Sequence, residues 1–276
     1  MGKKIIFLDI DGTLTEPGSN EPPESAADAV RKAREKGNYV FLCTGRNYGM
    51  LRPLLKYGFD GVVASSGGYI RCGENVVYDC PFTEAQKEKL LDVLEKSGIY
   101  RTVECVDGSY TDESFKEFLQ ANVKAGSNSE ALRWRKQIEE SLNILPMEQY
   151  QGQPVYKVVA MCEKESQLEE IRKIFGKEME ICIQGSDEFG YTNGEIISRE
   201  FNKGKGVERV CDFLHIPLED TVGFGDSLND KDMIQTVALG ICMDGGDKRL
   251  QKIADDICSA VDQDGIYRFF EKYHLM

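Results

Sequence analysis

The chain has 276 residues, of which 41% are hydrophobic and 29% charged, and this composition excludes a disordered or fibrous protein. The formal net charge of -13 arises from 47 acidic and 34 basic residues, so we expect neither nucleic acid nor anionic membranes as partners. No apolar run is long enough to span a membrane, and Asp9 interrupts the first apolar stretch before a signal-peptide core is complete, which predicts a cytoplasmic protein.

The first 80 residues alternate short apolar runs with segments of helical periodicity. The expected elements are strands at 4–9, 39–43 and 60–64, helices at 24–36 and 47–57, and a hairpin over Tyr69–Asp79 that turns at Gly73, Glu74 and Asn75. This alternation is typical of a parallel sheet with crossover helices.

Between residues 81 and 186 the pattern changes, and helices and strands are expected to group around a separate core. The expected helices lie near 83–97, 112–121, 129–142 and 165–175, and the strands at 100–106, 155–161 and 179–184. The segment Ile144–Val155 contains two prolines and several glutamines, which predicts a loop within this region. The region is interpreted as a second, inserted domain.

The first rhythm resumes after two strand-like segments, GSDEFGYTN and EIISRE. The expected elements are helices at 203–214, 229–236, 247–253 and 264–272 and strands at 220–224 and 237–242. We therefore assign 1–80 and 187–276 to one discontinuous core and 81–186 to the insertion. The predicted fold class is α/β, with a Rossmann-like parallel sheet core and an inserted α+β domain.

Polar side chains follow three of the predicted core strands directly. IIFLD reaches Asp9, YVFLCT reaches Thr44, and TVGFGD reaches Asp226. Because ligands of such sheets bind beyond the carboxyl ends of the strands, these three residues are predicted to share one rim.

Four acids are expected at this rim, namely Asp9, Asp11, Asp226 and Asp230. Two carboxylates about 4 Å apart repel by roughly 4 kcal/mol at an effective dielectric of 20, so the group needs a counter-charge. The set contains oxygen ligands without histidine or thiolate, which favours Mg2+ over zinc.

The nine cysteines are scattered singly, and Cys43, Cys162, Cys182 and Cys211 are interpreted as small apolar residues.

Each motif has a simpler reading when taken alone. DIDG could be a turn with solvated acids, and GDSLND could be a capped helix N-terminus. Lys203 and Lys205 could be ordinary solvated lysines, although lysine at a helix N-terminus opposes the helix dipole. The coincidence of these features at successive strand ends favours a functional site.

Together the motifs resemble the haloacid-dehalogenase superfamily of phosphatases, specifically the Cof-type hydrolases with a type IIB cap. DIDGT resembles the first motif, CTGR the second, NKG the third and GDSLND the fourth, in the order that the family shows. Ser66 stands where these proteins usually carry asparagine, and CMDGGD departs from the usual Asn-Ala after the methionine.

The resemblance implies roles for the site residues. Asp9 would be the nucleophile and Asp11 the general acid and base, and Thr44 and Lys203 would hold the phosphoryl group and its charge. Mg2+ would be held by Asp9, Asp226 and the carbonyl oxygen of Asp11, with Asp230 in the metal set or orienting water or Lys203. Gly45, Arg46 and Asn229 would contact phosphate or substrate.

The inserted domain would act as a cap that selects the substrate. Its candidate residues are Trp134, flanked by Arg133 and Arg135 and interpreted as a core residue, and the polar segment Asp107–Ser114. We expect a Mg2+-dependent phosphatase of small phosphorylated metabolites, with sugar phosphates as the expected substrates, acting as a monomer or homodimer. The alternatives are a phosphomutase that uses the same Asp9 and Asp11, and a non-catalytic sensor of Mg2+ and phosphate.

Overall fold

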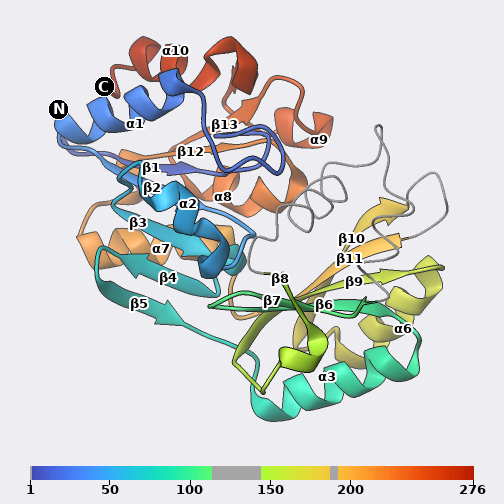
Figure 1. Ribbon diagram of the computed structural model, residues 1–276. Coiled ribbons are helices and arrows are strands. Elements are labelled where there is room, and N and C mark those ends of the chain that lie inside the picture. Colours follow the sequence, from blue (N-terminus) through green and yellow to red (C-terminus); the bar gives the residue numbers. More distant parts are fainter. Residues whose placement is uncertain (1, 114–143, 187–191) are drawn as a thin grey trace. The chain divides into compact units, whose positions relative to one another are not determined.

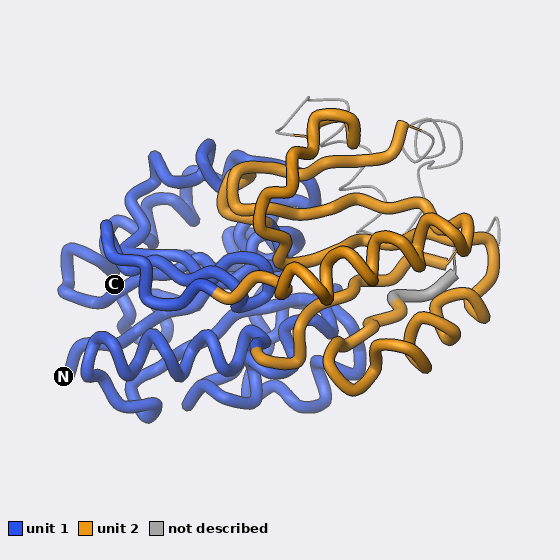
Figure 2. The backbone as a smooth tube through the Cα atoms, turned by 90° about the horizontal axis from the view of Figure 1, so that it is seen from below, with its two compact units in different colours: residues 1–46, 51–79, 201–276 blue, residues 47–50, 80–200 orange. Residues whose placement is uncertain are grey.

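The computed structural model describes residues 2–113, 144–186 and 192–276. The chain divides into two compact units (Figure 2). Unit 1 comprises Met1–Arg46, Leu51–Asp79 and Phe201–Met276, and unit 2 comprises Asn47–Met50 and Cys80–Glu200. Unit 2 thus begins its long segment at Cys80, and unit 1 resumes at Phe201.

Unit 1 contains an eight-stranded sheet. Its strands are β1 (Ile5–Leu8), β2 (Tyr39–Cys43), β3 (Gly61–Ala64), β4 (Tyr69–Cys72), β5 (Asn75–Asp79), β12 (Thr221–Gly225), β13 (Leu239–Met243) and β14 (Asp256–Cys258). The strand order is β14-β13-β12-β1-β2-β3-β4-β5. Neighbours from β14 through β3 are parallel, whereas β4 and β5 form an antiparallel hairpin on β3.

Helices cover both faces of this sheet (Figure 1). They are α1 (Glu24–Glu35), α2 (Arg52–Leu55), α7 (Lys203–Leu214), α8 (Lys231–Thr236), α9 (Lys248–Gln251) and α10 (Gly265–Lys272). Phe7 and Phe41 pack in one cluster with apolar residues of α7 and α8. Phe224 points to the opposite face, where its ring lies 5.1 Å from that of Phe269 in α10. Since both faces are covered, the central strands are apolar throughout, as all-parallel strands require.

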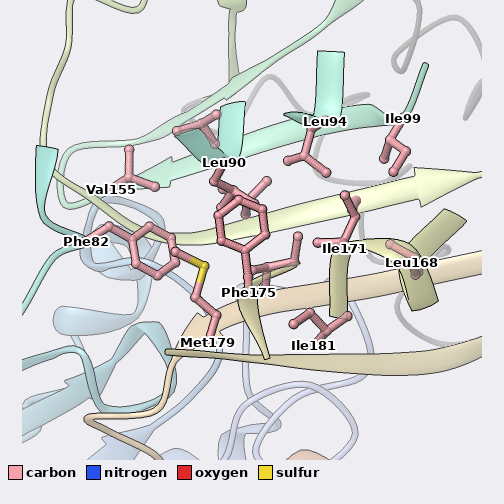
Figure 3. Packing of buried hydrophobic residues seen from close by; sticks show 14 of the residues in the cluster. Phe82, Leu90, Leu94, Ile99, Val155, Leu168, Ile171, Phe175, Met179 and Ile181 are labelled. Carbon is pink, nitrogen blue, oxygen red and sulfur yellow. The ribbon is translucent and has the colours of Figure 1, made fainter. Parts of the chain in front are cut away.

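Unit 2 contains a six-stranded sheet in the order β10-β11-β9-β6-β7-β8. Its strands are β6 (Tyr100–Cys105), β7 (Ser109–Thr111), β8 (Ile144–Pro146), β9 (Val155–Cys162), β10 (Met179–Ser186) and β11 (Thr192–Ser198). Helices α3 (Glu84–Lys96) and α6 (Glu165–Phe175) pack on one face. Figure 3 shows Leu90 and Leu94 of α3 and Leu168, Ile171 and Phe175 of α6 gathered over that face.

Charged side chains interrupt the interior of unit 2. Lys157 in β9 is fully buried, and its Nζ lies 2.7 Å from Oε1 of Glu195 in β11 and 3.4 Å from Oε2 of Glu104 in β6. Alternate residues of β9 point to opposite faces, so Lys157 lies on the face away from Val158, which packs with α3 and α6.

Most predicted elements of the core are found within one or two residues of their expected limits, and the predicted fold class is confirmed. Three short strands were not predicted: β7, β14 and β8, the last of which opens the segment interpreted as a loop. The predicted helices at 112–121 and 129–142, and Trp134 with them, lie outside the described residues apart from 112–113. Within the described ranges no helix is long and apolar enough to cross a bilayer.

Candidate active site

The turn that follows β1 places the first two acids. The carbonyl oxygen of Ile10 accepts hydrogen bonds from the backbone N–H groups of Thr13, Leu14 and Thr15, which closes a tight turn around Gly12. Gly12 has a φ of +79°, a conformation that glycine adopts without steric cost. Parallel pairing fixes the position of Asp9, whose N–H donates to the carbonyl of Phe224 in β12 at 3.0 Å.

Asp9 is paired with a buried lysine from the far end of the sequence. The Nζ of Lys203 donates to Oδ1 of Asp9 at 2.7 Å, and the Lys203 side chain is fully buried. Lys203 is the first residue of α7, and the side chain of Asn202 caps this helix by accepting from the N–H of Lys205 at 2.7 Å. The cap satisfies a helix donor and sets the direction in which the helix begins.

Asp230 links the lysine to the loop after β12. Its Oδ1 accepts from Nζ of Lys203 at 2.5 Å, and its Oδ2 accepts from the N–H groups of Asp226 at 3.0 Å and Ser227 at 3.1 Å. Asp230 is fully buried. Three donors therefore engage its carboxylate, and a small sideways movement of Asp230 would disturb both Lys203 and Asp226.

Without a bound cation, the cluster of buried carboxyl groups is electrostatically unfavourable in its ionised form. Burial raises the pKa of Asp9, the charge of Asp230 raises it further, and Lys203 offsets only part of this rise. Burial also raises the pKa of Asp226, with added contributions from Asp230 and Asp9. Burial alone would lower the pKa of Lys203, but the charges of Asp230 and Asp9 outweigh it, so its pKa lies above the usual value. One buried ammonium faces at least three carboxyl groups.

The same three carboxyl groups fit a divalent metal. Oxygen atoms of Asp9, Asp226 and Asp230 all lie within 4.8 Å of one another. An all-oxygen donor set is the kind that Mg2+ prefers, and a dication would offset the repulsion between carboxylates that adds to the effect of burial on their pKa values. The residues present therefore fit the predicted ion.

The remaining predicted residues lie in the loops beside this cluster. Thr44, which follows β2, is buried, and its Oγ1 accepts from the N–H of Arg46 at 3.1 Å. Gly45 is buried between them. Asn229 is half-buried, and its Oδ1 accepts from Oγ of Ser227 at 2.8 Å and from Nζ of Lys203 at 3.5 Å.

Arg46, which the sequence predicts to contact phosphate or sugar, pairs with Asp11 in the structure. Its Nε donates to Oδ2 of Asp11 at 2.8 Å and its Nη2 to Oδ1 of Asp11 at 2.6 Å, a two-pronged pair. Nη1 donates to Oδ1 of Asn20 at 2.7 Å, and Nη2 also donates to the carbonyl of Ser19 at 3.0 Å. The side chain is 1% exposed. Four of its N–H groups are thus used inside the protein.

One structural feature of the site was not predicted from the sequence. The turn after β3 has positive φ values at Ser65, Ser66 and Gly67, and its N–H groups hold the second motif, because Ser66 donates to the carbonyl of Thr44 at 2.9 Å. A Cβ on Gly67 would lie 2.4 Å from the carbonyl oxygen of Asn202. The only sequence signal for this packing was the run of small residues in SSGG.

The chain is similar in sequence to known hydrolases. A sequence model of the family described as haloacid dehalogenase-like hydrolase matches residues 6–270. The chain is 25% identical to the phosphatase YwpJ of Bacillus subtilis strain 168 over 290 residues, which cover 99% of this chain and 100% of that protein. It is 23% identical to the HMP-PP phosphatase of Yersinia pestis strain Pestoides F over 244 residues, 87% of this chain and 83% of that protein.

The fold has a matching counterpart among solved structures. The structure of the HAD subclass IIB sugar phosphatase BT4131 superposes with a TM-score of 0.76, covering 99% of this chain and 100% of that one. The sequence identity is 21%, so this likeness establishes the fold and nothing finer.

Proposed function

Because the chain belongs to the haloacid dehalogenase-like hydrolases, as its four motifs suggested, we propose that it is a Mg2+-dependent phosphatase that hydrolyses small phosphate monoesters through an aspartyl-phosphate at Asp9. The single observation that carries this proposal is the pairing of Asp9 with Lys203 among the carboxyl groups of Asp226 and Asp230. A buried carboxylate beside a buried ammonium and a metal-binding group is arranged to meet an incoming phosphoryl group.

Asp9 and Asp11 divide the chemistry between them. An oxygen of the Asp9 carboxylate bonds to phosphorus as the bond to the leaving oxygen breaks, and Asp11 gives its proton to that oxygen. Water then bonds to phosphorus, its proton passes to the Asp11 carboxylate, and the carboxylate of Asp9 is released with inorganic phosphate. One group attacks while the other moves the proton, which explains two acids in one short turn.

The metal would be held by the carboxylates of Asp9 and Asp226 and by the carbonyl oxygen of Asp11. When bound, it supplies positive charge that offsets the repulsion between the acids and the transferring phosphoryl group. Asp230 serves this centre by orienting Asp226 and Lys203, since three donors already engage its carboxylate.

Other residues would hold the phosphoryl group. Lys203 neutralises charge on Asp9 and on the phosphoryl oxygens, and Thr44 and the backbone at Gly45 donate hydrogen bonds to those oxygens. Asn229 contributes a polar group next to Lys203. Such fixed donors act most strongly in a buried site, where water does not screen them.

We further propose that the substrates are phosphorylated metabolites such as sugar phosphates, and that unit 2 selects among them. This proposal is supported by the names of two similar proteins, one a sugar phosphatase and the other an HMP-PP phosphatase. The four motifs all lie in unit 1, so the selecting residues are expected in the insertion.

The test is release of inorganic phosphate from p-nitrophenyl phosphate and from a panel of phosphorylated metabolites, ranked by kcat/KM. We expect turnover with Mg2+, its loss with EDTA, and its loss in Asp9→Asn. Rapid acid quenching should trap one added phosphoryl group on the peptide that contains Asp9. Conversion of one sugar phosphate isomer to another without phosphate release would indicate a phosphomutase instead, and undiminished turnover in Asp9→Asn would refute the proposed mechanism.

A further inference from the structure

We infer that Arg46 is a positioning residue that fixes the carboxylate of Asp11 for proton transfer, rather than a residue that binds phosphate or substrate. The inference rests on the proposed function, because it takes Asp11 as the general acid and base. Its basis is the two-pronged pair between the guanidinium of Arg46 and both carboxylate oxygens of Asp11.

The geometry defines the plane and the rotation of the Asp11 carboxylate. A single hydrogen bond leaves a carboxyl group free to turn, whereas two parallel N–H···O bonds from a planar guanidinium fix both its position and its orientation. The N–H of Gly18 adds a third donor, at 2.7 Å from Oδ1 of Asp11. Asp11 lies in the turn closed by Ile10, so both its backbone and its side chain are fixed.

Arg46 is itself held rigidly. The side chain of Asn20 and the carbonyl of Ser19 also accept hydrogen bonds from the guanidinium, so two residues of the loop at 18–20 hold it in place. Its backbone is also fixed, because its N–H donates to Oγ1 of Thr44 and its carbonyl accepts from Ser65 at 2.8 Å. A side chain that is 1% exposed and has four N–H groups engaged has little capacity left for a ligand.

This role makes a distinctive kinetic prediction. The leaving oxygen of p-nitrophenyl phosphate departs readily without a proton, whereas that of sn-glycerol 3-phosphate requires one. A general acid contributes about 10²–10⁴-fold to a step that needs its proton. Because hydrolysis of the aspartyl-phosphate is common to both substrates, the comparison uses kcat/KM, which reports phosphoryl transfer to Asp9. Arg46→Ala should lower kcat/KM about 10²-fold or more on sn-glycerol 3-phosphate and less than about tenfold on p-nitrophenyl phosphate.

Asp11→Asn provides the reference, and the double variant provides the decisive test. If Arg46 acts through Asp11, the variant with both changes should be no slower on p-nitrophenyl phosphate than Asp11→Asn alone. Arg46→Lys should not restore the rate, because an ammonium cannot reproduce the planar pair, whereas added guanidinium ion should partly restore Arg46→Ala.

Arg34 offers a matched control in the same unit. Its Nε and Nη2 donate to the two carboxylate oxygens of Asp60 at 2.9 and 2.8 Å, the same pattern at an exposed position. Arg34→Ala should leave unchanged the ratio of kcat/KM on sn-glycerol 3-phosphate to kcat/KM on p-nitrophenyl phosphate. If Arg46→Ala does not fold, Asn20→Ala loosens Arg46 more gently and should shift the ratio in the same direction.

Several outcomes would overturn the inference. An equal loss of kcat/KM on both substrates, or multiplying effects in the double variant, would each assign Arg46 to phosphate or substrate binding. Failure of the proposed function is distinguishable from these results, because it would show as turnover in Asp9→Asn or as an unchanged substrate ratio in Asp11→Asn itself.

Discussion

Gly12 lies directly against the carboxylate of Asp226, so closely that a Cβ on Gly12 would be 2.5 Å from Oδ2 of Asp226. The first and the fourth motifs therefore meet at a point where only a hydrogen atom fits. The turn after β1 and the loop after β12 are brought there by the parallel pairing of the two strands.

Gly12→Ala should impair metal binding more than stability. The substitution adds left-handed strain of about 1–2 kcal/mol and displaces Asp226. We expect the Mg2+ concentration for half-maximal activity to rise about 10–100-fold, as measured by titration of phosphatase activity. Gly37→Ala is the matched control, because Gly37 has a φ of +97° but open space around a Cβ, and it should lose only stability. Equal effects of the two variants on activity would contradict this account.

Lys203→Met should reduce both activity and stability. It leaves the carboxyl groups of Asp9 and Asp230 buried without their ammonium, a change that typically costs about 3–5 kcal/mol. The rate of phosphate release should fall about 10²–10³-fold. Lys205→Met, two residues further along α7, should retain activity within a few fold, since Lys205 is half-buried and outside the proposed set. Urea unfolding and initial rates measure the two effects, and a stable, active Lys203→Met would refute the assigned role.

Stability of the metal-free protein should fall as the pH rises from about 5 to about 8. The pKa values of Asp9 and Asp226 are raised in the folded state, so folded protein binds more protons than unfolded protein above the usual carboxyl range near 3.9. The slope of the unfolding free energy with pH is then negative. Lys203 stays charged in both states across this window, because its pKa lies above the usual value of a lysine.

Addition of Mg2+ should flatten this slope, because the bound ion requires deprotonated carboxylates. Thermal unfolding in EDTA and in Mg2+, at several pH values, provides the measurement, and Asp226→Asn should show a shallower slope in EDTA. Stability that rises with pH in EDTA over the same window would show that these carboxyl groups are ionised without metal.

Lys157→Met should destabilise the protein through unit 2. The variant leaves Glu104 and Glu195 buried near each other without the ammonium, with an expected cost of about 3–5 kcal/mol. Lys96→Met removes an exposed pair with Asp92 on α3 and should cost less than about 1 kcal/mol. Urea unfolding compares the two. Equal, small losses would mean that the buried group of charges is not a determinant of stability.

Ser66→Asn should slightly stabilise the protein. Ser66 has a φ of +57°, a left-handed conformation that asparagine tolerates better than serine does. A gain of a few tenths of a kcal/mol in unfolding free energy is expected, whereas Ser66→Val should lose at least 1 kcal/mol. A β-branched side chain that is tolerated without loss at this position would contradict the strained turn.

Periodicity alone predicted the core strands and most core helices, because each is a contiguous run whose apolar pattern records which side is buried. The sequence then predicted that Asp9, Thr44 and Asp226 share one edge of the sheet, because the carboxyl ends of parallel strands lie at the same edge. β7, β8 and β14 escaped prediction because three residues are too few to show a period, and β8 in addition depends on pairing with β7, which is distant along the chain. The pairing of β11 with β9 and β10, both in unit 2, likewise depends on contacts that no local pattern records.

The sequence by itself determined the α/β class, and it predicted an insertion and a set of acids with a lysine at one rim of the sheet, because these follow from local pattern and residue type. Tertiary structure alone decided the partners of the buried charges. Nothing in the sequence indicated that Arg46 pairs with Asp11 or that Lys157 is buried between two glutamates. Hydrogen bonds act over about 3 Å between side chains that are far apart along the chain, so their pairing becomes fixed only when strands and loops are packed together.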